Sequence, residues 1–120
     1  MGRAPLLRLQ DMLQNIEAAL AEVAALSEGQ LEADSVLYAA CQFRILVIAE
    51  AAKDLPQSYR DLHPEIAWSG LIRMGDLLRH QYFRIESQVV WHAIVRDFPR
   101  LLAAVQSMIK LEGAELAGAD

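Results

Sequence analysis

The sequence VLYAACQFRILVIAEAA at residues 36–52 decides the fold class, because it is apolar on nearly every side of a helix. Its strongly polar residues are Gln42, Arg44 and Glu50. A helix with so little polar surface belongs at the centre of a bundle, where neighbouring helices cover it. Arg44 and Glu50 are six residues apart, so they face opposite sides of a helix that advances about 100° per residue. Each is therefore predicted to pair with a residue from another segment.

Apolar side chains recur every three or four residues on both sides of this segment, which is the spacing of one-sided helices. The predicted helices cover residues 5–27, 31–55, 68–83 and 86–113, with a short helical turn inside residues 57–67. Gly29 is predicted to take a left-handed conformation after the first helix, and Asp34 or Ser35 to begin the second. Four long helices with short connections predict one all-α domain over residues 1–120, an up-and-down four-helix bundle.

Two residues bear on the last predicted helix. Pro99 lies inside its apolar pattern and should kink or divide it, because proline lacks a backbone N–H group. Gly113 should end it, which leaves residues 114–120 as a frayed tail.

The composition limits the protein's partners. A hydrophobic fraction of 54% is high for a chain of 120 residues and indicates that a partner, such as a second copy, covers part of the surface. The net charge of −5 argues against non-specific coating of nucleic acid, although residues 57–110 carry seven Lys/Arg and five Asp/Glu, a local balance of +2. We see no membrane-spanning stretch and no secretory signal, and the one cysteine, Cys41, fits a reducing compartment. We expect a cytoplasmic protein without a membrane partner.

Charged and titratable side chains gather in the sequence LIRMGDLLRHQYFR at residues 71–84. On a helix, Arg73, Asp76, His80 and Arg84 share one face. Asp76 lies four residues before His80 and can hydrogen-bond one ring nitrogen, which would fix the tautomer. Arginines bind phosphate, and a histidine can move a proton. The stretch therefore predicts phosphodiester chemistry that needs no metal.

The commoner explanation of such a pattern is a solvated helix face with ion pairs four residues apart. Other chemistries fit less well, since the sequence has no cluster of metal-ligand spacing and no glycine-rich phosphate loop. No metal and no cofactor is expected. Cys41 lies in the apolar run and is predicted to be an inert core residue.

Five short segments add a resemblance to a known family. They are IAEAAK at residues 48–53, PEIAW at 64–68, LRHQYF at 78–83, VW at 90–91 and FPRL at 98–101. Their order and spacing resemble the HepT-like family, a branch of the HEPN superfamily of small helical proteins. The resemblance extends from about residue 9 to about residue 110.

The resemblance implies a homodimeric all-α bundle that acts as a metal-independent endoribonuclease, the toxin of a toxin–antitoxin pair. Its partner would be a cognate minimal nucleotidyltransferase, an MntA-like antitoxin, which attaches AMP to a tyrosine and thereby silences the toxin. Carried over to this sequence, His80 is the catalytic histidine that acts on RNA, and Tyr82 is the site of AMPylation.

This sequence differs from the family's motif at the position of the arginine. The commonest form of the family has Arg-Asn where this chain has Gly75-Asp76. Arg73, six residues before His80 and on its helical face, and Arg79, directly before it, are the candidates. A dimer could also bring either arginine of one chain to the histidine of the other. Tyr82 would point away from His80 on a regular helix, so it joins the site only if the helix ends there or the second subunit supplies it.

Two other functions remain open. The protein could be a non-catalytic binding partner of a nucleotidyltransferase, in which the arginine motif has decayed. It could also be a dimeric helical scaffold without enzymatic activity.

Overall fold

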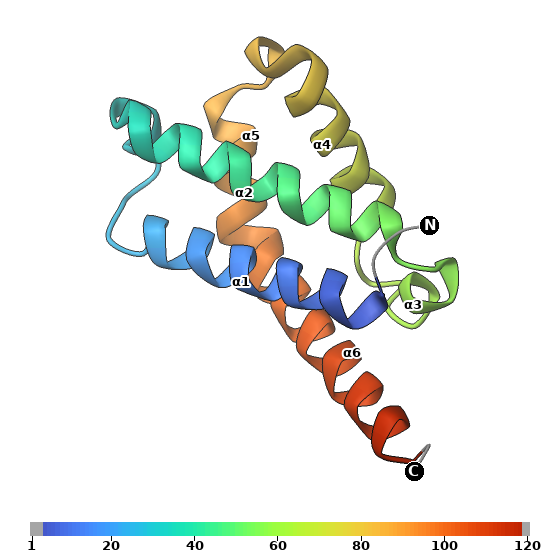
Figure 1. Ribbon diagram of the computed structural model, residues 1–120. Helices are drawn as coiled ribbons and strands as arrows, with labels where there is room; N and C mark the ends of the chain where they lie inside the picture. Colours follow the sequence, from blue (N-terminus) through green and yellow to red (C-terminus); the bar gives the residue numbers. More distant parts are fainter. Residues whose placement is uncertain (1–3, 119–120) are drawn as a thin grey trace.

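The computed structural model describes the backbone of residues 4–118 and the side chains of residues 4–113, and these residues form helices with short connections (Figure 1). In chain order the elements are α1 (Pro5–Val23), the 3-10 turn η1 (Leu31–Ala33), α2 (Ser35–Asp54), α3 (Gln57–Asp61), α4 (Trp68–Gln81), the 3-10 turn η2 (Tyr82–Arg84), α5 (Ser87–His92), the π-helical turn η3 (Ala93–Asp97) and α6 (Phe98–Gly118). The predicted all-α bundle is confirmed.

Helix α2 is central to the bundle. It packs against α1 on one side and α4 on the other, while α1 also packs against α6 (Figure 1). The core fills the space between these helices, and its largest fully buried side chains are Leu9, Met12, Ile16, Leu31, Ile45, Ile48, Val90, Ile94, Phe98, Val105 and Met108. The helix with the least polar sequence therefore has neighbours on two sides, as predicted.

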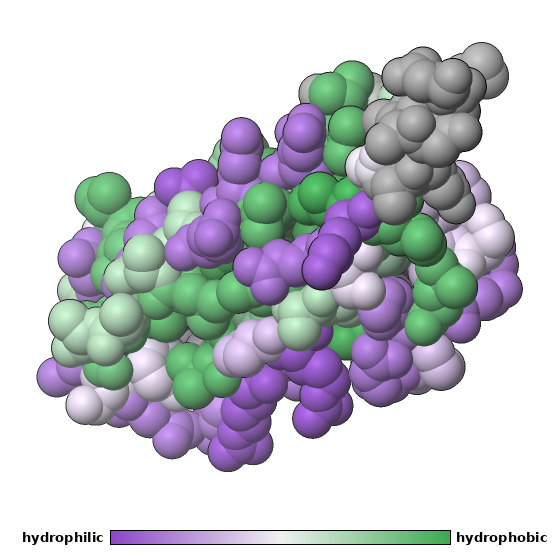
Figure 2. Space-filling view, turned by 90° about the horizontal axis from the view of Figure 1, so that it is seen from below, coloured by the Kyte–Doolittle hydropathy of each residue, from purple (hydrophilic) through white to green (hydrophobic). Residues whose placement is uncertain are grey.

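One side of α2 is buried and the opposite side is not. Cys41, Ile45 and Ile48 face the core, whereas Val36 and Phe43 are 79% and 59% exposed. Within residues 4–118, α2 is the one helix long and apolar enough to cross a membrane by length and composition. Its packing between α1 and α4 accounts for the apolar side that faces the core. Its exposed side leaves apolar surface for a partner to cover. Other hydrophobic residues reach the surface between hydrophilic ones on the face seen from below (Figure 2).

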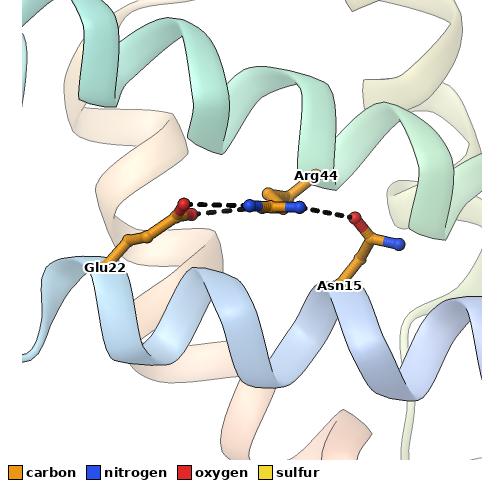
Figure 3. A network of polar contacts seen from close by, with 3 residues as sticks. All are labelled: Asn15, Glu22 and Arg44. Atoms are coloured by element: carbon orange, nitrogen blue, oxygen red, sulfur yellow. Dashed lines mark hydrogen bonds and ion pairs between the residues drawn. The ribbon is translucent and has the colours of Figure 1, made fainter.

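The charged residues of α2 pair with other helices. The Arg44 guanidinium donates from Nε to Glu22 Oε1 at 3.2 Å and from Nη2 to Glu22 Oε2 at 3.0 Å, and its Nη1 lies 3.4 Å from Asn15 Oδ1 (Figure 3). Both partners lie on α1. On the other side of α2, Glu50 forms an ion pair with Arg79 of α4. The prediction that Arg44 and Glu50 each find a partner elsewhere is confirmed.

Cys41 belongs to the same interior. Its burial, together with the negative charge of Glu22, raises the pKa of the thiol to about 11. The thiol is therefore protonated at neutral pH, and a protonated, fully buried thiol is a poor nucleophile. This agrees with the prediction of an inert core cysteine.

The predicted first residues of the helices agree with the structure better than the predicted last residues do. Asp34 caps α2, and its Oδ1 accepts a hydrogen bond from the Leu37 N–H at 3.0 Å. Gly29 has a φ of 91°, which is the left-handed region that was predicted. However, α1 ends at Val23 rather than near residue 27. The Ser27 N–H donates to the Gln30 side chain at 2.7 Å, so a turn replaces the last predicted helical residues.

Pro99 neither divides the last helix nor leaves it regular. The helix continues from α5 into α6, and η3, a π-helical turn over Ala93–Asp97, lies just before the proline. Proline cannot donate a backbone hydrogen bond and crowds the carbonyl four residues earlier, here that of Val95. The wider π turn accommodates this within a continuous helix.

The prediction that Gly113 ends the helix and that the tail frays is wrong for residues 114–118, which continue α6 to Gly118. Residues 119–120 lie outside the described part of the chain. The sequence AELA that follows Gly113 consists of good helix formers. These residues outweigh the single glycine, which costs about 1 kcal/mol in a helix interior.

Helices α2 and α4 approach most closely at Gly75. A Cβ atom built on Gly75 would lie 2.3 Å from Ala49 Cβ, far inside van der Waals contact. We expect Gly75→Ala to destabilise the protein by about 1–3 kcal/mol, because the overlap outweighs the gain in helix propensity. Urea unfolding followed by circular dichroism measures this difference in the free energy of unfolding.

Gly113 supplies the matched control, since it also lies in a helix but a Cβ there would meet no atom within 4 Å. Gly113→Ala should stabilise the protein by up to about 1 kcal/mol. Equal effects of the two substitutions would mean that α2 and α4 do not meet closely at Gly75.

Candidate active site

The titratable residues of the sequence motif lie at the end of α4, and this helix stops earlier than predicted. Its last residue is Gln81, whose φ of −145° and ψ of 48° depart from helical values. The next three residues form the 3-10 turn η2 rather than a further helical turn. The chain therefore changes direction directly after His80, which is exposed.

This break releases Tyr82 and Phe83 from the regular phase of the helix. Their side chains are 66% and 75% exposed, and their rings meet edge to face with centroids 6.0 Å apart. The condition under which Tyr82 could join the site, that the helix ends before it, is met. No hydrogen bond engages the Tyr82 hydroxyl within the described residues.

Asp76 does not orient His80 in this structure. Its carboxylate lies 3.5 Å from Lys53 Nζ on α2, and no hydrogen bond joins it to His80 among the residues described. The helical spacing allowed that bond, but Asp76 lies on the side of α4 that faces α2, where a lysine is available. In this structure Asp76 links two helices, and no contact between described residues joins it to His80 as predicted.

Gly75 occupies the position at which the motif usually has an arginine, and there is no room for an arginine there. Gly75 is buried against Ala49, and a Cβ atom at Gly75 would already overlap its neighbour. An arginine at Gly75 would therefore not fit this packing of α4 on α2. An arginine that acts together with His80 would therefore have to come from another position.

Arg79 is one of the two candidates, and α2 holds it in place. Its Nη2 forms the ion pair with Glu50, and the side chains are 44% and 31% exposed. A guanidinium has five N–H donors in a planar fork. The pair with Glu50 engages Nη2, and the exposed part of the side chain leaves other donors of the guanidinium available to a ligand.

Arg73 is the other candidate and lies two helical turns before His80. It borders an open groove of about 410 Å³ together with Arg84, which follows the helix break. Arg84 Nη1 donates to the neutral amide oxygen of Gln81 at 2.8 Å. Neither Arg73 nor Arg84 forms an ion pair with an acid within residues 4–113.

Sequence reasoning missed two residues that shape the site. Glu50 and Lys53 of α2 hold Arg79 and Asp76 of α4. Both belong to the IAEAAK segment at residues 48–53, but their partners follow from how two helices cross, which no local pattern records. Within the described residues, no group of three or more His, Cys, Asp and Glu side chains is arranged to hold a metal ion.

Comparison with known proteins adds the family. Residues 12–108 match the family described as "Ribonuclease HepT-like". The chain belongs to this family. No solved structure matches the chain.

Several relatives carry ribonuclease names. The chain is 30% identical over 104 residues to "Putative RNase TTE0752" of Caldanaerobacter subterraneus subsp. tengcongensis, which covers 87% of this chain and 93% of the relative. It is 38% identical over 64 residues to "Probable ribonuclease HepT" of Thermococcus cleftensis, covering 53% of this chain and 58% of that protein. It is 33% identical over 70 residues to "Putative RNase MJ0127" of Methanocaldococcus jannaschii, covering 58% of each.

Proposed function

We propose that this HepT-like protein is a metal-independent endoribonuclease that cuts single-stranded RNA as the toxin of a toxin–antitoxin pair. The observation that carries the proposal is an exposed histidine, His80, at the end of a helix that also presents Arg73 and Arg79, in a chain of the HepT-like family. The names of its relatives support the same class of enzyme.

In the proposed reaction, the 2′-hydroxyl of the RNA attacks the adjacent phosphorus, and the bond from phosphorus to the 5′ oxygen breaks. His80 exchanges protons with the attacking and leaving oxygens. The arginines stabilise the negative charge that develops on the phosphate oxygens. The products are a 2′,3′-cyclic phosphate and a free 5′-hydroxyl. Arg79, held by Glu50, and Asp76, held by Lys53, fix α4 so that His80 keeps its position.

The proposed assembly is a homodimer. Val36 and Phe43 expose apolar side chains on the outer side of α2, and such surface is commonly covered by a partner. The partner that silences the toxin would be a cognate nucleotidyltransferase that attaches AMP to Tyr82. The exposure of Tyr82, two residues after His80, supports this role.

Incubation of the purified chain with single-stranded RNA in excess EDTA tests the activity. We expect internal cleavage that leaves cyclic phosphate ends, because no step requires a metal ion. DNA of the same sequence should stay intact, since it lacks the attacking 2′-hydroxyl. Intact RNA, or cleavage that stops when EDTA is added, would contradict the proposal.

A non-catalytic binding partner of a nucleotidyltransferase is the second candidate, favoured by the absence of an arginine at Gly75. The same experiment separates the two functions. RNA that stays intact, combined with AMP addition to the chain, would identify the binding partner. Intact RNA without AMP addition would favour the helical scaffold.

A further inference from the structure

The groove beside the end of α4 has a composition that the ribonuclease motif does not explain. Its basic residues are Arg73 on α4 and Arg84 on η2, and its apolar lining comes from both sides of the α4–α5 connection. The apolar residues are Met74, Leu77, Ile85 and Val89. At about 410 Å³ the groove lies in the size range of small-ligand sites.

The helix break is what brings the two arginines to one groove. Arg73 and Arg84 are eleven residues apart, and on a continuous helix they would be separated by roughly 16 Å along its axis. The chain instead leaves the helix at Gln81, and η2 turns it toward α5. Arg84 thus borders the same groove as Arg73.

The charges in the groove favour an anion. Neither guanidinium has an acidic partner within residues 4–113, although three other arginines of the chain, Arg8, Arg44 and Arg79, do. One carboxylate, that of Glu86, borders the groove against these two cations. Glu86 offsets part of this charge, so the groove keeps a local excess of positive charge in a chain with a net charge of −5.

The apolar lining favours a flat, weakly polar group between the charges. A ligand that carries phosphates and a stackable ring fits both properties, and a nucleotide of an RNA strand is such a ligand. The base has to be unpaired to lie against the groove floor, because a paired base is enclosed in its helix.

We propose that this groove is a nucleotide subsite, in which Arg73 and Arg84 bind backbone phosphates of single-stranded RNA and the base between them lies on Met74, Leu77, Ile85 and Val89. The subsite rests on the proposed ribonuclease function, since it would lead the strand toward His80. It assigns Arg84 a positioning role on the substrate, which the motif of arginine, histidine and tyrosine does not include.

Fluorescence anisotropy of a labelled 2′-O-methyl RNA tests the subsite, because this RNA lacks the attacking hydroxyl and reports binding without cleavage. In the full-length protein, Arg84→Gln should weaken binding by roughly three- to tenfold at 0.1 M salt. It should also reduce the slope of log affinity against log salt by about 0.7, the value for one lost phosphate contact on a single strand. Arg96→Gln is the matched control, since Arg96 is also exposed, lies on η3 and does not border the groove.

The apolar floor has its own pair of variants. Val89→Asp introduces a negative charge into the groove and should weaken RNA binding by about tenfold. Val95→Asp changes a residue of similar exposure, 41% against 45%, outside the groove and should bind RNA as the wild type does. Thermal unfolding of each variant establishes that it is folded.

The results separate this inference from the ribonuclease proposal. Normal RNA binding by Arg84→Gln and Val89→Asp would overturn the subsite, even if the wild type cleaves RNA. A loss of binding in these variants, with a wild type that never cleaves, would support the subsite and reject the nuclease. A change in oligomer mass in Arg84→Gln without a change in RNA binding would assign the groove to a protein contact and overturn the proposal.

Discussion

His80→Ala is expected to lower the rate of RNA cleavage by about 10²–10⁴-fold, the usual contribution of a general acid–base group. His80 is exposed, and its side chain forms no hydrogen bond to a described residue. Its removal should therefore leave the fold and the affinity for RNA nearly unchanged. A loss that falls on the rate of cleavage rather than on binding is the signature of a group that acts in the transition state.

Rates of cleavage under single-turnover conditions, with the protein in excess over RNA, measure this effect. His92→Ala is the control, because His92 lies on α5 and contacts Glu28 at 3.1 Å, away from the arginines of α4. It should cleave RNA at the wild-type rate. Equal rates for His80→Ala and the wild type would remove His80 from the mechanism, and a loss in both variants would point to a general effect on the fold.

The central position of α2 was predictable because its sequence contains so few polar residues. A segment with polar residues only at Gln42, Arg44 and Glu50 has few places in a small protein other than between neighbours. The start of α2 was also predictable from local sequence, since the Asp34 side chain accepts a hydrogen bond from a backbone N–H group three residues later. Helix starts marked by a capping side chain can be predicted from sequence for this reason.

The ends of α1, α4 and α6 were less predictable. Neither proline nor glycine marks the end of α4 at Gln81, and Gly113 does not end α6. At these positions the balance between a further helical turn and a change of direction depends on packing and on the following residues. Helix propensity alone differs by less than about 1 kcal/mol between the alternatives, so it does not decide them.

In the candidate site, too, features that depend on local sequence were predictable, whereas features that depend on packing between helices were not. The sequence identified the helical face of Arg73 and His80, since that face depends only on the spacing of residues. It placed Asp76 with His80, whereas the structure pairs Asp76 with Lys53. Position 75 shows the difference most clearly, because the missing arginine was visible in the sequence, but its cause, the contact with Ala49, required the structure.

Tyr82→Phe is expected to abolish the addition of AMP by the cognate nucleotidyltransferase. In this reaction the tyrosine oxygen attacks the α-phosphate of ATP, the bond to the β-phosphate breaks and pyrophosphate leaves. The side chain must be accessible, and Tyr82 is 66% exposed. Phenylalanine keeps the ring and its edge contact with Phe83 and removes only the nucleophilic oxygen.

The other tyrosines serve as controls within the same chain. Tyr38 is half-buried, and its burial, together with the charge of Glu32, raises the pKa of its hydroxyl. The Tyr59 hydroxyl donates to Glu112. Both are poorer acceptors of AMP, so Tyr38→Phe and Tyr59→Phe should gain the same mass as the wild type. Intact-mass spectrometry after incubation with the enzyme and ATP measures the number of AMP units.

Modification of Tyr82 should also weaken RNA binding, for an electrostatic reason. The added phosphate is an anion within three residues of Arg79 and Arg84, which are groups proposed to bind RNA phosphates, and of His80. It would occupy their hydrogen-bond donors and repel the incoming strand. We therefore expect the AMP-modified protein to bind the 2′-O-methyl RNA at least tenfold more weakly than the unmodified protein. Undiminished AMP addition to Tyr82→Phe, or full RNA binding after modification, would reject Tyr82 as the switch of this protein.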